Sequence, residues 1–331
     1  MIQRTPHVLW RLPNHSSVLA IDAQPTPMIG NLLPKAGFIF APFDSKGSHP
    51  TLLFPGTPHT FTVPTFPYPT LTDAIWTSPL PQFLDEFRSA HRLVSDGTLQ
   101  KFVLASHEDM SQDLRPYALS LFDRACRAYR DAFVALVSLP NRDMWLMATP
   151  ELLVNSHGDM LHTMALAGTQ CVDGMTWDSK NLREHNVVAR FVESRLRSLT
   201  SITSTSGPST VHAGTLAHLK TDFRAQMPQG VTAWDVARAL HPTPAMSGMP
   251  QGEAVEAIRR VETTDREYFS GMSGVFSPNG DADIYVTIRC MRLSEAGVRL
   301  YSGVGLMPDS DPTAEAEESA AKRLTMKNII S

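Results

Sequence analysis

Six charged residues of this chain could exchange protons, bind an anion or hold a metal ion. Carboxyl and amino groups serve as general acids and bases, carboxylates bind hard divalent cations, and a guanidinium matches the two oxygens of a carboxylate. The six lie far apart in the sequence, so only the fold can bring them together. They are Lys101, Glu151, Glu184, Arg289, Glu318 and Lys322.

Lys101 lies in a short apolar segment whose alternation predicts a strand over 100–106. The period of two places Lys101 on one face with Val103 and Ala105. A charged lysine on an apolar face loses hydration, so burial favours the neutral amine that could act as a general base. A lysine that extends past the strand edge into solvent is the alternative left open by the alternation.

Glu151 follows Pro150 at the end of a predicted strand. Proline ends the hydrogen-bonded ladder, so the next side chain projects at the rim of the sheet, where catalytic acids are often found. A solvated turn would have the same sequence.

Glu184 continues the apolar stripe of a helix predicted to begin near Ser179 and to end near Leu199, with Asp178 or Ser179 as its cap. It lies four residues before Val188, on the same face. A carboxylate in such a stripe lies at a wet helix end or is held by a partner such as a metal ion.

The last predicted helix carries three charged residues on one face. Asp311 is its expected cap and Pro312 its first residue, and Glu315, Glu318 and Lys322 follow at i, i+3 and i+7. From spacing alone, Glu318 and Lys322 are most simply a solvated ion pair.

Arg289 falls in a stretch predicted to form one strand over 283–293, after a strand at 271–276 and a turn at 279–281. Alternation places it on a polar face with Tyr285 and Thr287, which is usually an exposed face.

The remaining elements alternate between helices and strands, which favours an α+β fold. Residues 1 to about 80 are rich in proline and predict short edge strands that wrap a core. The other predicted elements are helices at 81–96, 115–130, 233–240 and 253–262, and strands at 132–138, 143–149, 159–166 and 298–306.

Composition excludes several classes of protein. The chain has 331 residues, 42% of them hydrophobic, and a net charge of -4. This balance makes neither nucleic acid nor a membrane an expected partner. Three unclustered cysteines indicate a reducing compartment and no thiolate metal site. No signal peptide or long apolar run occurs, and we expect a cytoplasmic protein.

Together these segments resemble the chorismate-utilising enzymes, the family of anthranilate synthase component I, and in particular its isochorismate-forming members. The resemblance covers about Leu99 to Ile330. Ser106-His107 departs from it, because many relatives have arginine there, and Gln251 replaces the lysine of ammonia-using members. The matching segments are Thr149-Pro150-Glu151, Ala167-Gly168-Thr169, Arg183-Glu184-His185, the loop His241-Pro242-Thr243-Pro244-Ala245, and Tyr301 to Gly305 with the acidic helix after it.

The resemblance implies one chorismate-binding domain over 1–331, in which two large antiparallel sheets pack face to face with helices outside. Residues 1–98 match poorly and look shortened, and 99–330 form the catalytic core. Mg²⁺ is expected on Glu184 and Glu318, with Glu315 acting through water. The substrate-binding residues implied are Gly168, Thr169, Ala245, Met246, Arg289, Gly303 and Lys322.

The reaction implied is the conversion of chorismate to isochorismate. The product could feed menaquinone or catechol siderophore biosynthesis, and the compact chain favours menaquinone. Lys101 would activate water for attack at ring carbon 2, and Glu151 would protonate the hydroxyl that leaves carbon 4. Because water is the nucleophile, no glutamine amidotransferase subunit is expected, and we expect a monomer. The alternatives are a salicylate synthase, an anthranilate or aminodeoxychorismate synthase, and a non-catalytic chorismate-binding regulator.

Overall fold

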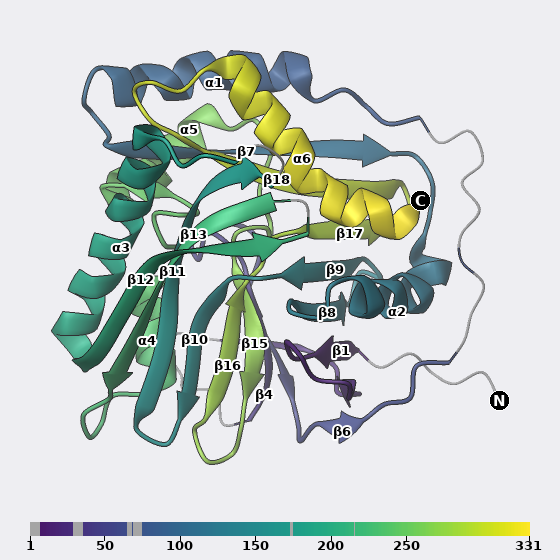
Figure 1. Ribbon diagram of the computed structural model, residues 1–331. Coiled ribbons are helices and arrows are strands. Elements are labelled where there is room, and N and C mark those ends of the chain that lie inside the picture. Colours follow the sequence, from purple (N-terminus) through teal and green to yellow (C-terminus); the bar gives the residue numbers. More distant parts are fainter. Residues whose placement is uncertain (1–6, 29–35, 65–67, 69–74, 173–174, 215) are drawn as a thin grey trace.

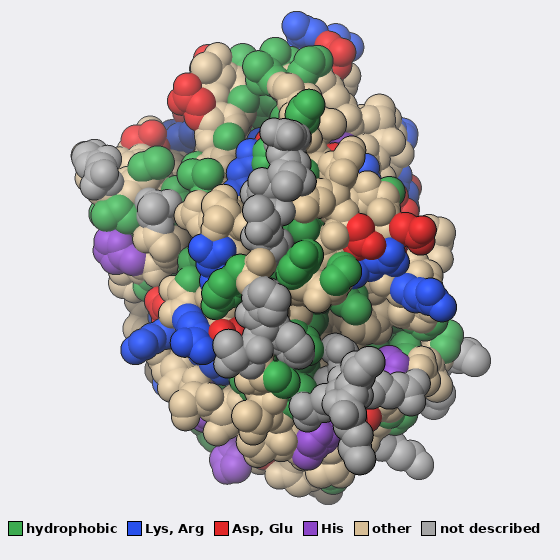
Figure 2. Space-filling view, turned by 90° about the vertical axis from the view of Figure 1, so that its right-hand side faces the viewer, with side chains coloured by type: hydrophobic (Ala, Val, Ile, Leu, Met, Phe, Trp, Pro, Cys, Tyr) green, Lys and Arg blue, Asp and Glu red, His purple; other side chains and the backbone are tan. Residues whose placement is uncertain are grey.

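The computed structural model describes residues 7–28, 36–64, 68, 75–172, 175–214 and 216–331. Two nine-stranded antiparallel sheets form the body of the molecule, with helices on their outer faces, as the α+β prediction requires (Figure 1). Among the described residues, no helix combines the length and the apolar character needed to cross a membrane. Basic and acidic side chains are interspersed on the face shown in Figure 2.

The first sheet joins both ends of the chain. Its longest pairing is that of β7 with β18, in which Phe102 lies opposite Leu306 and Met110 opposite Val298. In spatial order its strands are β14 (Gly248–Met249), β7 (Lys101–Met110), β18 (Gly297–Leu306), β17 (Cys290–Ser294), β9 (Met144–Thr149), β8 (Phe133–Ser138), β1 (Val8–Arg11), β2 (Leu19–Ile21) and β6 (His59–Thr60).

The second sheet is built on the long hairpin of β12 and β13. β11 pairs with β13 along most of its length, with a bulge between Ala167 and Thr169. In spatial order its strands are β12 (Ser201–Ala213), β13 (Leu216–Gln226), β11 (Met160–Cys171), β10 (Leu152–His157), β16 (Ala282–Val286), β15 (Met272–Phe276), β4 (Gly37–Ala41), β5 (Leu52–Pro55) and β3 (Thr26–Pro27).

An aromatic core fills the space between the sheets. Trp10 and Trp145 of the first sheet contact Phe38 and Phe40 of the second, with ring centroids 5.4 Å and 5.9 Å apart, and all four side chains are fully buried. Burying aromatic surface of this extent is a dominant stabilising contribution in folding.

The helices cover the outer faces, and each buries an apolar stripe. α3 and α4 pack on the second sheet, α2 and α6 on the first, and α1 and α5 over β7 and β18. Their bounds are α1 (Leu80–Ser95), α2 (Ala118–Ala128, after a 3-10 turn at Arg115–Tyr117), α3 (Ser179–Leu199), α4 (Ala233–Leu240), α5 (Gln251–Val261) and α6 (Pro312–Ile330).

The structure corrects the expected role of the N-terminal segment. Its strands were expected to wrap a core, but β1 and β4 are buried along their whole length and continue the two sheets, β1 beside β8 and β4 beside β15. The prolines lie outside these two strands, which is why a proline-rich segment can still supply buried strands.

The predicted strand over 283–293 is also wrong. β16 ends at Val286 in the second sheet, and β17 begins at Cys290 in the first, so Thr287 to Arg289 cross between the sheets. Arg289 has a left-handed backbone with φ of 48°. This conformation is uncommon outside glycine, and alternation cannot reveal it. The side chain of Arg289 is therefore not on a strand face with Tyr285 and Thr287.

Candidate active site

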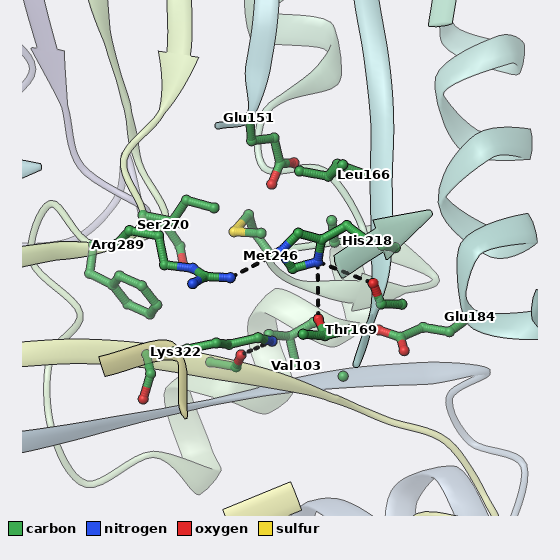
Figure 3. Close-up of a pocket in the computed structure, with 18 of the residues that line it drawn as sticks. Val103, Glu151, Leu166, Thr169, Glu184, His218, Met246, Ser270, Arg289 and Lys322 are labelled. Carbon is green, nitrogen blue, oxygen red and sulfur yellow. Dashed lines mark hydrogen bonds between the residues drawn. The ribbon is translucent and has the colours of Figure 1, made fainter. Parts of the chain in front are cut away.

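One cavity lies where the two sheets meet at the ends of several strands, between α3 and α6 (Figure 3). Both sheets, both helices and the proline loop contribute to its wall. Most of the residues singled out from the sequence line it: Lys101, Glu151, Gly168, Thr169, Glu184, Ala245, Met246, Arg289, Gly303 and Lys322. Glu315 and Glu318 are not among the lining residues.

Lys101 is fully buried, but its surroundings are not wholly apolar as the alternation suggested. Its Nζ lies 3.0 Å from Glu184 Oε1, which reaches β7 from α3. Within the described residues, Nζ makes no contact with hydrogen-bond geometry.

Gly305 on β18 makes the contact between Lys101 and Glu184 possible. A Cβ atom at this position would lie 2.0 Å from Glu184 Oε1 and 2.9 Å from Lys101 Cε. Burial raises the pKa of Glu184, but the positive charges of Lys101, Lys180 and Lys322 more than offset this, and the net shift is downward. Glu184 is therefore an anion at neutral pH.

Glu151 has the opposite protonation state. It lies at the start of the turn into β10, is 3% exposed, and points its carboxyl group into the cavity (Figure 3). Burial raises its pKa to about 8, against the smaller opposing effects of Lys101, Lys322 and Arg289. Two carboxyl groups of one cavity thus differ in charge, the arrangement that general acid catalysis needs.

Arg289 is 6% exposed and is held by uncharged partners. Its Nη1 donates to Thr325 Oγ1 at 3.1 Å, and its Nη2 lies 3.0 Å from His218 Nε2. Burial lowers its pKa to about 10, which still leaves it charged at neutral pH. No carboxylate of the described residues lies within ion-pair distance of it. A buried guanidinium without a carboxylate is a strong candidate for binding an anionic ligand.

His218 on β13 fixes the side chain of Arg289 and was missed from the sequence. Its Nδ1 lies 3.1 Å from the carbonyl oxygen of Gly168 and 3.3 Å from Thr169 Oγ1 (Figure 3). Burial, and then the charge of Arg289, lower its pKa well below the usual value. A neutral ring that donates from Nδ1 to the carbonyl accepts at Nε2 from Arg289.

The bulge in β11 supplies the carbonyl of Gly168. This residue has φ of 75° and interrupts the pairing of β11 with β13. Glycine adopts this left-handed conformation without the steric cost that other residues meet, and such bulges re-aim the groups beside them. The strand predicted over 159–166 continues through the bulge to Cys171.

α6 directs Glu315, Glu318 and Lys322 toward the interior. The spacing favoured a solvated ion pair between Glu318 and Lys322, and this prediction is wrong. Glu318 and Lys322 do pair at 2.7 Å, but their side chains are only 22% and 15% exposed. Lys322 also donates to the carbonyl oxygen of Gly303 at 2.7 Å. Glu315 is 1% exposed and forms an ion pair with Lys180 of α3.

The donor set of α3 and α6 fits magnesium in its chemistry. Glu184, Glu315 and Glu318 offer only carboxylate oxygens, which Mg²⁺ prefers. Oε2 of Glu315 is buried and has no hydrogen-bond partner in the part of the chain that the structure describes. Burial and the charge of Glu318 raise the pKa of Glu315 to about 7, so these two carboxylates lie near each other. Each of the three pairs with a lysine, and the described residues contain no ready-made group of three metal ligands.

The proline loop is held against the cavity by a second buried ion pair. Arg266 bonds Glu262 at 2.5 Å and donates to the carbonyl oxygens of Met246 and Val103, each at 2.7 Å. The loop and β7 are thereby fixed to one guanidinium. Arg266 and Glu262 had no distinguishing signal in the sequence, since an i,i+4 pair is usually exposed.

Ser270 was also missed. It lines the cavity with φ of 62°, is 1% exposed, and its hydroxyl has no partner among the described residues. The hydroxyl of Ser106, in the segment Ser106-His107 that departs from the resemblance, lies 3.4 Å from Arg323 Nη1 of α6, so a guanidinium reaches this strand from the helix.

Comparison with known proteins agrees with the geometry of the cavity. A model of the chorismate binding enzymes matches residues 72–331, which include all the residues described above. The chain belongs to the chorismate binding enzyme family. The predicted family and fold are thereby confirmed, and this fold is shared with solved structures.

Isochorismate synthases are prominent among the related family members. Isochorismate synthase EntC of Escherichia coli is 31% identical over 73% of this chain and 65% of its own length. A Mycobacterium tuberculosis protein assigned as isochorismate synthase MenF is 31% identical over 81% of this chain and 78% of its own. This chain thus spans less than two thirds of EntC.

A crystal structure shows the same architecture over nearly the whole chain. A Bacillus anthracis protein assigned as DhbC, a 2,3-dihydroxybenzoate-specific isochorismate synthase, superposes with a TM-score of 0.84. It covers 98% of this chain and 95% of its own, with 25% identity.

Proposed function

We propose that this protein is an isochorismate synthase that isomerises chorismate by adding water at ring carbon 2 and releasing the hydroxyl at carbon 4. The observation that carries the proposal is Glu151, a buried carboxyl group with a pKa of about 8 that faces the same cavity as the buried amine of Lys101. A neutral acid and an amine in one cavity can protonate a leaving hydroxyl and deprotonate an attacking water.

The positive side chains account for the substrate's charge. Chorismate carries two carboxylates, and Arg289 lacks a carboxylate partner among the described residues, so we assign it the side-chain carboxylate. The backbone of Gly168 and Thr169, the loop residues Ala245 and Met246, and Gly303 with Lys322 complete the proposed substrate site.

Each proton has a source and an acceptor within the chain. Lys101, once it has lost its own proton to solvent, takes a proton from the attacking water as the water oxygen bonds to carbon 2. The ring double bonds shift, and Glu151 gives its proton to the hydroxyl leaving carbon 4. Lys101 then returns a proton to Glu151 through solvent, which resets both groups. The products are isochorismate and water, and no net proton is consumed.

We propose that Mg²⁺ is held by Glu184 and Glu318, with Glu315 acting through water. When bound, the ion would neutralise the ring carboxylate of the substrate and orient the ring. The support is the carboxylate donor set and the partnerless, buried Oε2 of Glu315.

Product analysis tests the proposal. Purified protein incubated with chorismate and Mg²⁺ should form isochorismate, identified by chromatography and NMR. Salicylate with pyruvate would instead identify a salicylate synthase, and an aminated product formed with ammonium an ammonia-using relative. Binding without turnover would identify a chorismate-binding regulator.

We assign the product to menaquinone biosynthesis. The support is the relative from Mycobacterium tuberculosis assigned as MenF, which matches 81% of this chain at 31% identity. Expression in a strain that lacks its menaquinone-specific isochorismate synthase should restore menaquinone. Rescue only of a strain deficient in a catechol siderophore would refute the assignment.

A further inference from the structure

Lys180 lies among the carboxylates that would hold the metal ion, although no substrate role has been assigned to it. It is the second residue of α3, one helical turn before Glu184 and on the same face. Its ammonium pairs with Glu315 across the gap to α6. Lys101 and Lys322 line the cavity, but Lys180 does not.

Glu315 is the ion-pair partner of Lys180, and the charges of Glu184 and Glu318 also act on its ammonium. Lys101 and Lys322 are the ion-pair partners of Glu184 and Glu318. The ammonium of Lys180 therefore neutralises Glu315, one of the three groups that a divalent cation would use.

The position of Lys180 is unfavourable without these carboxylates. The N-terminus of a helix carries a partial positive charge, which disfavours a cation in the first turn. The first turn of α3 contains no acidic residue, and the Lys180 side chain is only 19% exposed. Its place is therefore maintained by Glu315 and its acidic neighbours.

We propose that Lys180 competes with the divalent cation for the carboxylates of α3 and α6 and so sets how weakly the ion binds. This inference rests on the metal site of the proposed function. A cation that draws on Glu315, even through water, competes with the ammonium of Lys180 for that carboxylate, so the affinity for the cation is lower than it would be without Lys180. At low metal concentration, the ammonium of Lys180 also reduces the electrostatic repulsion among the carboxylates of α3 and α6.

The test measures Mg²⁺ affinity without using activity. Thermal unfolding is followed as Mg²⁺ is titrated at constant ionic strength, because a ligand that binds the folded state raises the melting temperature with concentration. Lys180→Met removes the charge at similar size, and Lys180→Gln keeps a donor for Glu315. Both should bind Mg²⁺ at least about tenfold more tightly, equivalent to about 1.4 kcal/mol.

Arg183→Met is the matched control. Arg183 lies in the same part of α3 and pairs with Asp309 just before α6, but this pair is half exposed and holds no proposed ligand. Its Mg²⁺ affinity should stay within about twofold of the wild type, since exposed charges are screened. In EDTA, Lys180→Met should also melt at a lower temperature than Arg183→Met, because Glu315 loses its counter-charge.

Unchanged or weaker binding in the Lys180 variants would overturn the inference and make Lys180 a residue that positions Glu315. Equal tightening by Arg183→Met would overturn it too, as a general charge effect. If Lys180→Met does not fold, Lys180→Gln decides. If the wild type makes isochorismate but its melting temperature and activity do not respond to Mg²⁺, the metal site and this inference are disproved, while the proposed synthase activity stands. If the Lys180 variants bind Mg²⁺ more tightly but the wild type forms no isochorismate, the inference is supported and the proposed activity is disproved.

Discussion

Raising the pH should switch off this enzyme through Glu151. Burial moves the pKa of this carboxyl group from 4.5 to about 8. At about 1.4 kcal/mol per pKa unit, ionising this carboxyl group costs about 5 kcal/mol more in the buried site than in water. A general acid must be protonated, so activity is present below the folded pKa and lost above it. Glu151 is protonated in about nine tenths of the free enzyme at pH 7 and in about one tenth at pH 9.

The assay is kcat/KM for isochorismate formation between pH 6 and pH 10, at fixed ionic strength and saturating Mg²⁺. This parameter reports groups of the free enzyme, and it should fall about tenfold per unit above pH 8. Glu151→Gln should lower the rate roughly 10²- to 10⁴-fold and remove this decline from the residual activity. Glu253→Gln, an exposed glutamate on α5, is the control and should keep the wild-type profile.

A flat profile through pH 9.5, or the same decline in Glu151→Gln, would show that another group is the acid. In the complex, the two carboxylates of the substrate add negative charge near Glu151. The decline of kcat should therefore lie at higher pH than that of kcat/KM.

Other variants separate the base, the metal ligands and the packing around them. Lys101→Ala should abolish turnover but leave chorismate affinity within a few fold by calorimetry; a near-normal rate would disprove its role as base. EDTA should abolish activity and Mg²⁺ restore it, whereas Glu184→Ala and Glu318→Ala should each prevent this rescue; full activity in EDTA would contradict the metal assignment. Gly305→Ala places a methyl group against Glu184 Oε1 and Lys101 Cε. This overlap should cost about 1–3 kcal/mol of stability and weaken Mg²⁺ activation, and unchanged melting and activation would refute it.

Local signals identified most of the side chains in the cavity but not how they are charged. Alternation found Lys101, and helical spacing found Glu184 and the acidic face of α6. Neither pattern could show that Lys101 and Glu184 are in contact, because this contact joins β7 to α3 beside the backbone of Gly305. Charge states depend on such long-range neighbours.

Some of the elements missed from the sequence have no apolar period. β12 is exposed along most of its length and rich in serine and threonine, so it shows no apolar alternation. The crossing at Arg289 follows an apolar strand without glycine or proline to mark its end. His218 was overlooked because one histidine in a strand carries no motif.

The pairing of β4 with β15 has a consequence for synthesis on the ribosome. One edge of β4 can pair early with β5, but the other waits for Met272 to Phe276, roughly 230 residues later. At roughly 5–20 residues per second, this strand stays half-paired for roughly 10–50 s. Its fully apolar side chains, Phe38 and Phe40 among them, are therefore a natural target for chaperones that bind nascent chains.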